Sequence, residues 1–428
     1  MAIKTSKISS IEKKGFSPTI AEIDLNALLH NLEQVQKVSG PNRSIIAVVK
    51  ADAYGHGAIK VSQTLEAAGV KTLGVALVQE GIELRQAGIR VPILIMGSIL
   101  KEQIQSLFEF QLTPVLFQTP LIPLLEKEAE NRGMTLPVHL KIDTGMGRLG
   151  IQPLEIRPFL KEILANKRIR IEGIMTHFAD ADQTRPENTK KQLLLWNKIM
   201  EELREFNVNP PDIHLSNSAA ILSLPGVYSN PVRPGLMLYG YSSLKDPPLF
   251  LEPVLSFKTR VVHLKTVPPD TPISYGGTFV TSRQSVIATI AVGYADGYWR
   301  ALSNSGKVLI HGTRAPVVGR VCMDMTMIDV TGIPNIHMGD EVVLIGKQGE
   351  DFISAEEVAE WVGTISYEIL CGIGKRVPRV YQGAHVAPST GKAGLSLPLS
   401  LALLAGYILK GAHVTFSWSF LALLAGYL

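Results

Sequence analysis

Cysteine is scarce in this chain. Only two of the 428 residues are cysteines, Cys322 and Cys371. Two thiols so far apart cannot build a disulfide framework, and they are too few for a thiolate metal site. We therefore expect no metal centre and a protein of the reducing cytoplasm.

A strong net charge is also missing. Lys and Arg total 42 and Asp and Glu 38, so the formal net charge is only +4. The sequence has no stripe rich in lysine and arginine, no zinc-finger spacing and no aromatic-and-basic RNA motif, so nucleic acid is not an expected partner. Hydrophobic residues make up 46% and charged residues 19%, which predicts a folded chain. Its length favours two domains.

The terminal segments lack the long apolar run of a membrane-spanning helix. Residues 1–17 are basic but have no apolar core and no cleavage site, so we expect an N-terminal extension and not a signal peptide. Residues 384–428 are apolar and contain LALLAGY twice, at 401–407 and 421–427. Each apolar run is about 14 residues, whereas a spanning helix needs about 20. We favour a tail without a catalytic role, and a hairpin that associates with membranes is the alternative.

Eight short apolar runs alternate with helical patterns in the first part of the chain. They span residues 44–50, 72–77, 92–97, 112–117, 137–143, 170–177, 212–218 and 232–240. Runs that are nearly continuous in Val, Ile and Leu are typical of parallel strands buried on both faces. Eightfold alternation of strand and helix predicts an α/β fold, a (β/α)8 barrel of the TIM type, over residues 18–245. A strand–helix pair at 18–37 precedes it. A doubly wound open sheet is the alternative, but no GxGxxG fingerprint supports it.

The character of the sequence changes after about residue 245. Strand-like runs such as FKTRVVHLKTV and KVLIHGTRAPVVG follow one another with Gly and Pro between them. This pattern predicts a mostly-β domain over residues 246–383. One helix is expected within it, because Ser354 and Glu357 have the spacing of a capping box, and it should end near Leu370.

Polar residues follow several of the predicted barrel strands. In such barrels the catalytic groups lie at the C-terminal ends of the strands. The residues found there are Lys50, Asp143, His177, Asn217 and Ser218. Arg233 fits this rule least well, because it opens the eighth run and does not end it.

Lys50 ends an apolar strand, where a buried lysine is costly unless it is paired or neutral. It could extend its amine to the surface, or it could be a Schiff-base lysine that binds a cofactor aldehyde. The residue alone leaves both interpretations open. Tyr54 and the glycines beside it favour the second, because a hydroxyl and exposed backbone can hold a phosphate.

The loops after strands seven and eight often bind phosphate in this fold. Here they contain Asn217, Ser218 and Gly235, which can donate hydrogen bonds from an amide, a hydroxyl and bare backbone. A Ser–Asn pair is commonly just a helix N-cap. Its place in the predicted barrel makes the phosphate interpretation informative.

Several motifs in order resemble those of the alanine racemases. They are AVVKADAYGHG (47–57), KIDTGMGRLG (141–150), THFADAD (176–182), LSNSAA (215–220), RPGLMLYG (233–240), SYGGTF (274–279), VGYADGY (292–298) and GRVCMDMTMIDV (319–330). The resemblance runs from about residue 18 to residue 381 and covers both predicted domains. One such motif would be weak evidence, whereas eight in order identify the chain as a member of this family.

The resemblance implies an enzyme that uses pyridoxal phosphate to interconvert L- and D-alanine. Lys50 would carry the cofactor, and Arg233 would face its pyridine nitrogen. The other cofactor-binding residues that the resemblance implies are Tyr54, His177, Asn217, Ser218, Gly235 and Tyr367. In this family the usual purpose of D-alanine is peptidoglycan synthesis in the bacterial cytoplasm.

The resemblance also implies two catalytic bases on opposite sides of the substrate, Lys50 and Tyr275. Such a pair can remove the α-proton from one face and return one to the other. Arg148 and the backbone N–H of Met323 would bind the substrate carboxylate. A tyrosine can act as a base near neutral pH only if its pKa of about 10 is lowered, and His177 and Arg148 are candidates for lowering it.

Two further basic residues have implied roles. Lys141 matches a position that is carbamylated in some members and steadies the substrate arginine. Arg233 can only donate hydrogen bonds and stays charged. An arginine at the pyridine nitrogen would therefore disfavour its protonation and limit leakage to transamination.

The implied site draws on both predicted domains. Tyr275 and Met323 lie in the β domain, as does Tyr294, which would line the substrate entrance, whereas Lys50 lies in the barrel. The resemblance implies a homodimer in which the β domain of one subunit closes the barrel of the other. From the sequence, closure within one chain is equally open.

Three rival functions share the fold or the cofactor. A decarboxylase would need neither Tyr275 nor Arg233, and a non-catalytic pyridoxal-phosphate protein would resemble the barrel alone. A racemase of broader specificity, for serine or lysine, is hardest to separate, because motifs do not determine the width of the pocket.

Overall fold

The computed structural model describes residues 17–40, 42–183, 187–224, 226–227, 230–244 and 248–384. The predicted extension before residue 17 and the apolar tail after residue 384, including its repeat, lie outside the described residues. Among the described residues no helix is both long and apolar enough to cross a membrane.

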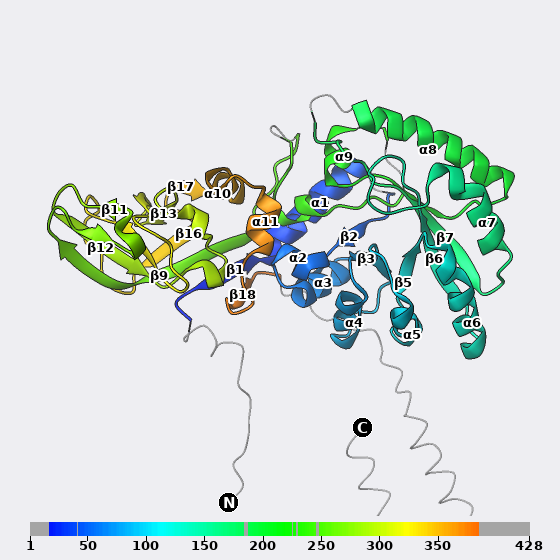
Figure 1. Ribbon diagram of the computed structural model, residues 1–428, viewed down its shortest axis with the longest axis horizontal. Coiled ribbons are helices and arrows are strands. Elements are labelled where there is room, and N and C mark those ends of the chain that lie inside the picture. The colour runs from blue at the N-terminus through cyan, green and yellow to red at the C-terminus, as the bar shows by residue number, and fades with distance from the viewer. Residues whose placement is uncertain are drawn as a thin grey trace, which may run out of the picture. The chain divides into compact units, whose positions relative to one another are not determined.

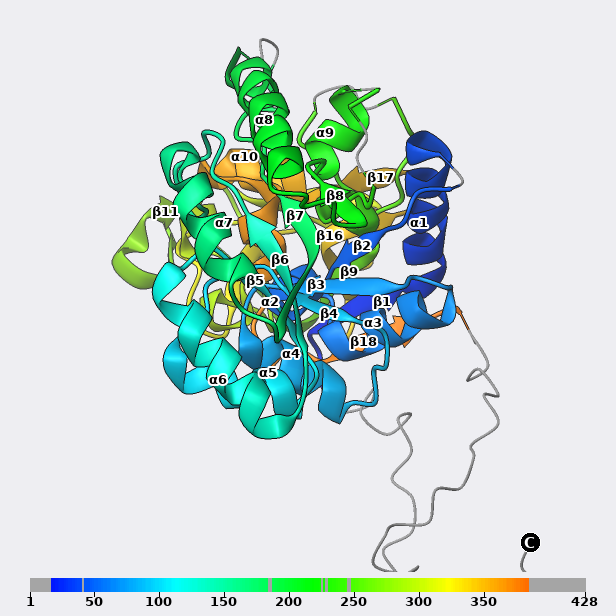
Figure 2. The same ribbon diagram turned by 90° about the vertical axis from the view of Figure 1, so that its right-hand side faces the viewer.

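A seven-stranded parallel sheet forms the first part of the chain (Figure 1). Its strands follow in sequence order: β2 (Ile46–Val48), β3 (Thr72–Val75), β4 (Ile93–Ile95), β5 (Thr113–Leu116), β6 (Leu136–Lys141), β7 (Ile169–Met175) and β8 (Asp212–His214). Seven of the eight predicted runs therefore form strands, and β2 and β4 are buried at every position. Figure 2 shows helices α4 to α8 on the outer side of this curled sheet.

The eighth run, 232–240, is the exception, and the prediction of a full strand there was wrong. Val232 bridges to Ile45 and Arg233 to Asn217, both in parallel, so this short segment joins the end of β8 to the start of β2. Pro234 accepts from the backbone N–H of Val48 at 3.0 Å but has no N–H to donate in return, so the ladder ends there. The chain then turns into the 3-10 helix η5 (Leu236–Tyr239).

The helices between the strands are amphipathic. For example, α7 buries Ile156, Phe159, Leu160 and Ile163, the i, i+3, i+4 and i+7 positions of one face. The helices of this region are α1 (Leu25–Ser39), α2 (Lys50–Tyr54), α3 (Ala58–Ala67), α4 (Val78–Gln86), α5 (Ile104–Glu109), α6 (Ile122–Arg132), α7 (Ile156–Leu164), α8 (Glu187–Glu205) and α9 (Ser218–Ser223). Short 3-10 turns are η2 (Lys101–Gln103), η3 (Thr119–Leu121) and η4 (Pro153–Glu155).

The second part of the chain is mostly β, as the sequence predicts. A nine-stranded sheet contains β9 (Leu255–Val267), β12 (Ser285–Ile290), β13 (Lys307–Ile310), β14 (Thr313–Pro316), β15 (Thr326–Asp329), β16 (Glu341–Gln348), β17 (Asp351–Ile353) and β18 (Arg379–Gln382), together with β1 (Ile20–Asp24). A small hairpin pairs β10 (Pro272–Ile273) with β11 (Phe279–Val280), and the 3-10 turns are η6 (Tyr275–Gly277), η7 (Tyr294–Asp296) and η8 (Arg300–Leu302).

The single helix expected between residues 354 and 370 is two helices. Ser354 caps the first by accepting a hydrogen bond from the backbone N–H of Glu357 at 3.0 Å, as the capping box predicts. That helix, α10 (Ala355–Val362), ends at Gly363, whose φ of 77° is left-handed. The chain restarts as α11 (Ser366–Cys371), which carries Tyr367.

The strand–helix pair at 18–37 is divided between the two regions. Strand β1 pairs antiparallel with β9 and parallel with β18, so it belongs to the nine-stranded sheet. Helix α1 follows it and contacts η5 of the barrel, where the side chain of Asn31 donates to the carbonyl of Leu238 at 3.1 Å. The predicted barrel range 18–245 thus begins with a strand of the other sheet.

Candidate active site

A cavity of about 450 Å³ lies at the C-terminal ends of the barrel strands. Ten residues singled out from the sequence line it: Lys50, Tyr54, Lys141, Arg148, His177, Asn217, Ser218, Arg233, Gly235 and Tyr367. The fold therefore brings together positions that are separated by more than 300 residues in the chain. Tyr367 comes from α11, which contacts α2 directly.

Lys50 opens α2, and the backbone that follows it has an unusual conformation. Ala51, Asp52, Ala53 and Tyr54 all have positive φ, between 53° and 55°. Left-handed backbone costs an L-residue about 1–2 kcal/mol, and such strain is found mainly at functional sites. Burial, followed by the charge of Arg148, lowers the pKa of Lys50. A lowered pKa favours the neutral amine, which is the nucleophilic form.

One end of the cavity carries neutral hydrogen-bond donors. The Ser218 hydroxyl lies 2.8 Å from the backbone nitrogen of Gly235 and accepts its hydrogen bond. The ring of Tyr54 lies 5.9 Å from the ring of Tyr367. Burial raises the pKa of Tyr54, so its hydroxyl keeps its proton and can donate. A Cβ at Gly235 would come within 2.5 Å of that hydroxyl oxygen, so only glycine leaves this space open.

Arg233 lies at the other end and is only 3% exposed. Its guanidinium donates to three carbonyls, of His214 at 2.5 Å, Thr176 at 2.7 Å and Leu215 at 2.9 Å. Burial lowers its pKa to about 9. These fixed contacts hold the guanidinium in one orientation in the wall of the cavity.

Two buried histidines behind Arg233 were missed by the sequence reasoning. His214 Nδ1 lies 3.0 Å from the Arg233 guanidinium, and His214 Nε2 lies 2.8 Å from His139 Nδ1. Because arginine only donates, His214 Nδ1 accepts and its Nε2–H donates to His139. Burial lowers the pKa of both, that of His139 to about 4, so the imidazoles are neutral beside the cation. The sequence carries a signal for His139, because side chains alternate along a strand. His139 therefore lies on the same face of β6 as Lys141.

The cavity carries excess positive charge. Its lining includes Lys50, Lys141, Arg148 and Arg233, but Asp182 is the single acidic residue among those that line it. Burial and then Arg148 lower the pKa of Lys141 to about 8. Burial and then Arg233 lower the pKa of His177 well below its usual value. Four basic groups around one acid fit an anionic ligand, such as a phosphorylated cofactor together with a carboxylate substrate.

Three predicted site residues do not line this cavity. Tyr275, Tyr294 and Met323 lie in the β region and are 72%, 43% and 52% exposed. They lie near one another, because Tyr294 N donates to the Cys322 carbonyl at 3.0 Å, and Ser274 Oγ to the Arg320 carbonyl at 2.7 Å. We call Tyr275, Tyr294 and Met323 the β-domain cluster.

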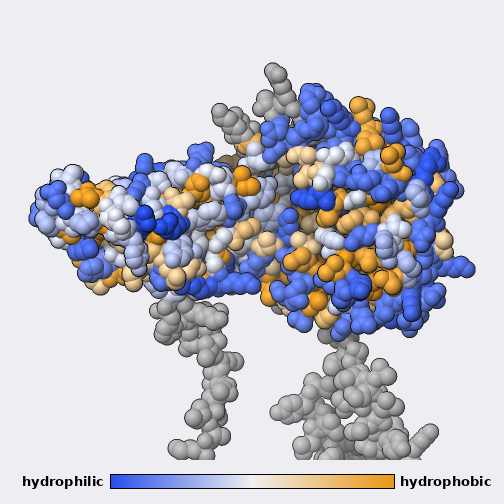
Figure 3. Space-filling view, in the orientation of Figure 1, coloured by the Kyte–Doolittle hydropathy of each residue, from blue (hydrophilic) through white to orange (hydrophobic). Residues whose placement is uncertain are grey.

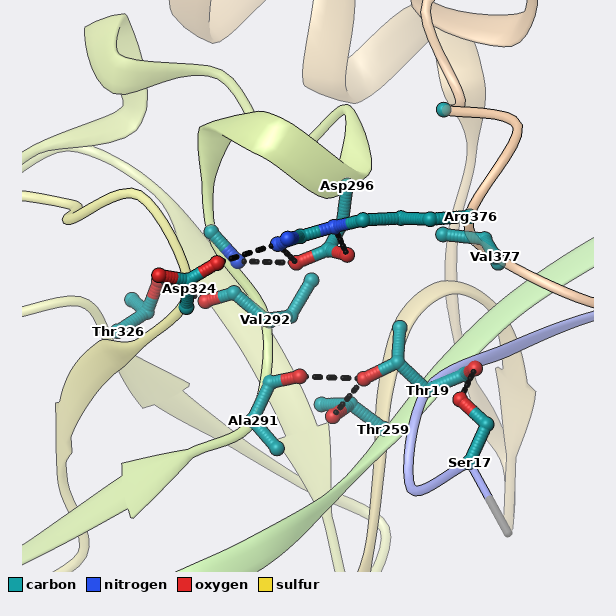
Figure 4. A network of polar contacts seen from close by, with 12 residues as sticks. Ser17, Thr19, Thr259, Ala291, Val292, Asp296, Asp324, Thr326, Arg376 and Val377 are labelled. Atoms are coloured by element: carbon teal, nitrogen blue, oxygen red, sulfur yellow. Dashed lines mark hydrogen bonds and ion pairs between the residues drawn. The ribbon is translucent and has the colours of Figure 1, made fainter.

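An arginine that the sequence reasoning missed braces the β-domain cluster. Arg376 donates to Asp296 at 2.7 and 3.0 Å and to Asp324 at 2.7 Å. Figure 4 shows its guanidinium between the two carboxylates. Asp296 also accepts from the backbone of Gly293 at 2.9 Å, so Arg376 fixes the turn that carries Tyr294 and the residue next to Met323. No short motif marks Arg376, because its partners lie 80 and 52 residues away.

The fold and cavity together define a class of protein. A lysine after the first barrel strand, neutral donors at one end of the cavity and a buried arginine at the other are a donor set that fits pyridoxal phosphate. The excess positive charge of the cavity and the space beside Gly235 agree with this. The class is therefore that of pyridoxal-phosphate enzymes built on a barrel.

Comparisons with known proteins identify the particular family. The alanine racemase N-terminal domain matches residues 23–243, and the alanine racemase C-terminal domain matches residues 254–381. An alanine racemase of Halothermothrix orenii is 49% identical over 374 residues, 87% of this chain and 99% of the relative. The chain belongs to the alanine racemase family, whose members are pyridoxal-phosphate-dependent isomerases.

Solved structures agree with this assignment. An alanine racemase of Clostridium difficile has a TM-score of 0.81 at 40% identity, and covers 85% of this chain and 96% of its own. An alanine racemase of Bartonella henselae described with covalently bound pyridoxal phosphate has a TM-score of 0.77 at 30% identity, over 85% of this chain and 99% of its own. The resemblance, fold class and cofactor predicted from the sequence are thereby confirmed.

Proposed function

We propose that this enzyme interconverts L- and D-alanine with two bases, Lys50 and Tyr275. The observation that carries the proposal is the cavity itself, where Lys50 lies with the donors and cations that the cofactor and substrate require. Pyridoxal phosphate, when bound, supplies the electron sink that stabilises negative charge at the α-carbon.

The neutral donors of the cavity would hold the cofactor's phosphate. Tyr54, Tyr367 and Ser218 would donate from their hydroxyls, Gly235 leaves the space open and binds the Ser218 oxygen with its N–H, and Asn217 caps α9 beside them. Arg233 would face the pyridine nitrogen. Its guanidinium is a donor that carries a positive charge and is held in place by three carbonyls, so it could donate a hydrogen bond to an unprotonated nitrogen but would disfavour a protonated one.

The proton moves between two faces of the substrate. Arg148 and the backbone N–H of Met323 hold the substrate carboxylate, which orients the α-carbon. The neutral Lys50 amine removes the α-proton from one face, and the Tyr275 hydroxyl delivers a proton to the other. The reverse direction exchanges the two roles. His177, whose pKa is well below its usual value, stays neutral beside the cations at the base of the cavity.

We propose that Lys141 is carbamylated and that its carbamate steadies Arg148. Carbamylation requires the neutral amine, and the pKa of about 8 provides a large neutral fraction near physiological pH. The modification would convert a buried cation into an anion beside Arg148. Carbon-13 NMR after exposure to labelled carbon dioxide would detect the carbamate, and a Lys141→Gln variant would remove the signal.

The second base requires a second copy of the chain. Tyr275 and Met323 are exposed and line no part of the cavity that holds Lys50. We propose a homodimer in which the β-domain cluster of each subunit closes the other's cavity, with Tyr294 lining the substrate entrance. Exposed hydrophobic side chains at the strand ends, Leu77 and Leu100 among them, suit such a contact. Figure 3 shows hydrophobic residues gathered over the middle of the barrel surface.

Mixed dimers test shared sites directly. Lys50→Ala and Tyr275→Phe subunits, each inactive alone, are unfolded and refolded together. Random pairing makes about half of the dimers mixed, and each mixed dimer has one intact site, so about a quarter of wild-type activity should return. If both residues act within one chain, no activity returns.

The activity itself is tested by α-proton exchange in heavy water, with L-alanine, added pyridoxal phosphate and a chiral assay. Exchange with formation of D-alanine, lost in Lys50→Ala, supports the proposal. Turnover of another amino acid alone would overturn the substrate but retain the fold and cofactor. Absence of exchange with every amino acid would favour a non-catalytic binding protein.

The cellular setting is proposed from the family. We place the enzyme in the cytoplasm, where its product D-alanine is used for peptidoglycan. The low cysteine content of the sequence supports this proposal. We retain the domain ranges 18–245 and 246–383, with β1 contributed to the second sheet.

A further inference from the structure

The carboxylate of Glu80 binds the left-handed turn after Lys50 at the end nearest to the lysine. The backbone N–H of Ala51 donates to Glu80 Oε1 at 2.5 Å. The other oxygen of Glu80 accepts from the backbone N–H groups of Ala76 at 2.8 Å and Leu77 at 3.0 Å. Glu80 lies in the first turn of α4, so its carboxylate ties the peptide that follows Lys50 to the loop after β3.

The far end of the same turn has separate ties. Nδ1 of the buried His56 lies 3.0 Å from the Ala53 carbonyl and 2.9 Å from the Tyr54 carbonyl. Carbonyls only accept, so Nδ1 carries the hydrogen. Arg379 Nε donates to the Gly55 carbonyl at 3.0 Å. The carbonyls of Ala53, Tyr54 and Gly55 are thus bound without Glu80. Loss of Glu80 would therefore release chiefly the end of the turn that carries Lys50.

We propose that Glu80 is a positioning residue for Lys50: by accepting from Ala51 N–H it holds the strained turn in the conformation that aims the lysine amine into the cavity. The inference rests on the proposed role of Lys50 as base. Four consecutive left-handed residues are unfavourable in isolation, so the turn needs external hydrogen bonds at both ends. Without the carboxylate, the peptide after Lys50 can relax and displace the amine from the α-carbon.

Glu80 has the further effect of an anion near the lysine. Burial lowers the pKa of Lys50 most, Arg148 lowers it further, and Glu80 opposes them. Removal of the carboxylate should therefore shift the titration of the Lys50 nitrogen to lower pH. Glu83 is not among the groups that shift the pKa of Lys50, so removal of its charge should leave that titration unchanged.

The chain offers a matched control one turn further along α4. Glu83 lines the same second cavity of about 700 Å³ as Glu80, on the other side of the turn from the active site. Its carboxylate is 3.5 Å from the side-chain nitrogen of Gln79 and has no contact with the turn among the hydrogen bonds of the described residues. Glu83→Gln removes the same charge from the same helix and leaves Ala51 N–H bound.

The experiment compares holoenzymes of wild type, Glu83→Gln, Glu80→Gln and Glu80→Ala. The midpoint of the visible absorbance change of the Lys50-linked cofactor is measured against pH without alanine, and kcat and KM for alanine are measured separately. We expect a downward midpoint shift in both Glu80 variants and a fall in kcat of about tenfold or more in Glu80→Ala. KM should stay within about twofold, because Arg148 is untouched. The kcat of Glu80→Gln should lie between those of wild type and Glu80→Ala, since its amide oxygen can still accept from Ala51 N–H.

The proposal is overturned if both Glu80 variants match Glu83→Gln in midpoint and kcat. It is also overturned if kcat falls only in proportion to lost cofactor or lowered melting temperature, because that result describes a structural residue. Should Glu80→Ala fail to fold, Glu80→Gln alone decides between these outcomes. The absorbance titration uses no substrate, so it stays decisive even if the racemase activity itself is not found.

Discussion

The barrel and the β region contribute to the site in different ways. In the barrel, groups such as Lys50 and Arg233 converge on one cavity and are buried enough to shift their pKa values. In the β region, Tyr275 and Met323 belong to motifs that were as clear in the sequence, yet they stand exposed and away from that cavity. The comparison teaches that motifs of equal clarity in the sequence can differ in the fold: one set is buried around a cavity, and the other is presented on the surface.

The largest effect should come from Tyr275→Phe. Loss of one of two bases should lower kcat by about 10²–10⁴-fold. Because Tyr275 lies outside the cavity, the absorbance of the Lys50-linked cofactor should stay as in wild type, whereas Lys50→Ala should abolish it. Steady-state kinetics and spectra of the two variants check this. A changed cofactor spectrum in Tyr275→Phe would contradict the division between the two regions.

Gly235→Ala should weaken cofactor binding in the barrel. The added Cβ would lie 2.5 Å from the Tyr54 hydroxyl, and such crowding costs about 1–3 kcal/mol, or roughly 5- to 150-fold in affinity. Equilibrium dialysis with pyridoxal phosphate measures it. Gly332→Ala is the control, since nothing lies within 4 Å of its added Cβ. Equal affinity in the two variants would show that the phosphate does not use this space.

Arg376→Ala should loosen the β-domain cluster without touching the barrel cavity. It removes the bidentate contact to Asp296 and the contact to Asp324. We expect KM for alanine to rise by roughly three- to tenfold at unchanged cofactor affinity, because the three lost hydrogen bonds act on the substrate only through the positions of Tyr294 and Met323. Lys375→Ala serves as the neighbouring control. A change in cofactor affinity with constant KM would show that Arg376 supports the barrel cavity and not the β-domain cluster.

The smallest expected effect concerns stability and Lys141. Its folded pKa of about 8 is below the usual 10.5, so the unfolded chain binds more protons between these values and stability rises with pH across that window. In protein kept free of carbon dioxide, so that Lys141 is the unmodified amine, replacing it by Met should raise the free energy of unfolding at pH 7 by roughly 1–3 kcal/mol, and the gain should shrink from pH 8 to 10.5. Urea denaturation of the two proteins checks this. A pH-independent difference would show that Lys141 is not a free amine.

Much of the architecture could be predicted because local patterns are strong. Runs such as IIAVV (45–49) are apolar along their whole length, so their burial in a parallel sheet follows from composition. The errors arose where one residue overrides the pattern. Pro234 stops the eighth strand after its bridges to Ile45 and Asn217, and Gly363 splits the expected helix of the β region.

Long-range partners could not be read in the same way. The segment at 20–24 was predicted as a strand that precedes the barrel within the range 18–245, but its partners are β9 and β18, more than 200 residues away. His139 and His214 are ordinary members of apolar strands until the sheet places them 2.8 Å apart behind Arg233. Pairings of this kind depend on which strands become neighbours, which no local pattern encodes.

The sequence by itself determined the chemistry that this protein can perform: which side chains can donate, accept or carry a proton, and on which strand ends they stand. Only the tertiary structure decided which of them act together. Burial shifts the pKa of Lys50 and Lys141, the carboxylate of Glu80 binds a left-handed turn, and Tyr275 is left exposed at the surface. Desolvation and proximity are properties of the folded chain, because both arise from neighbours that are distant in sequence.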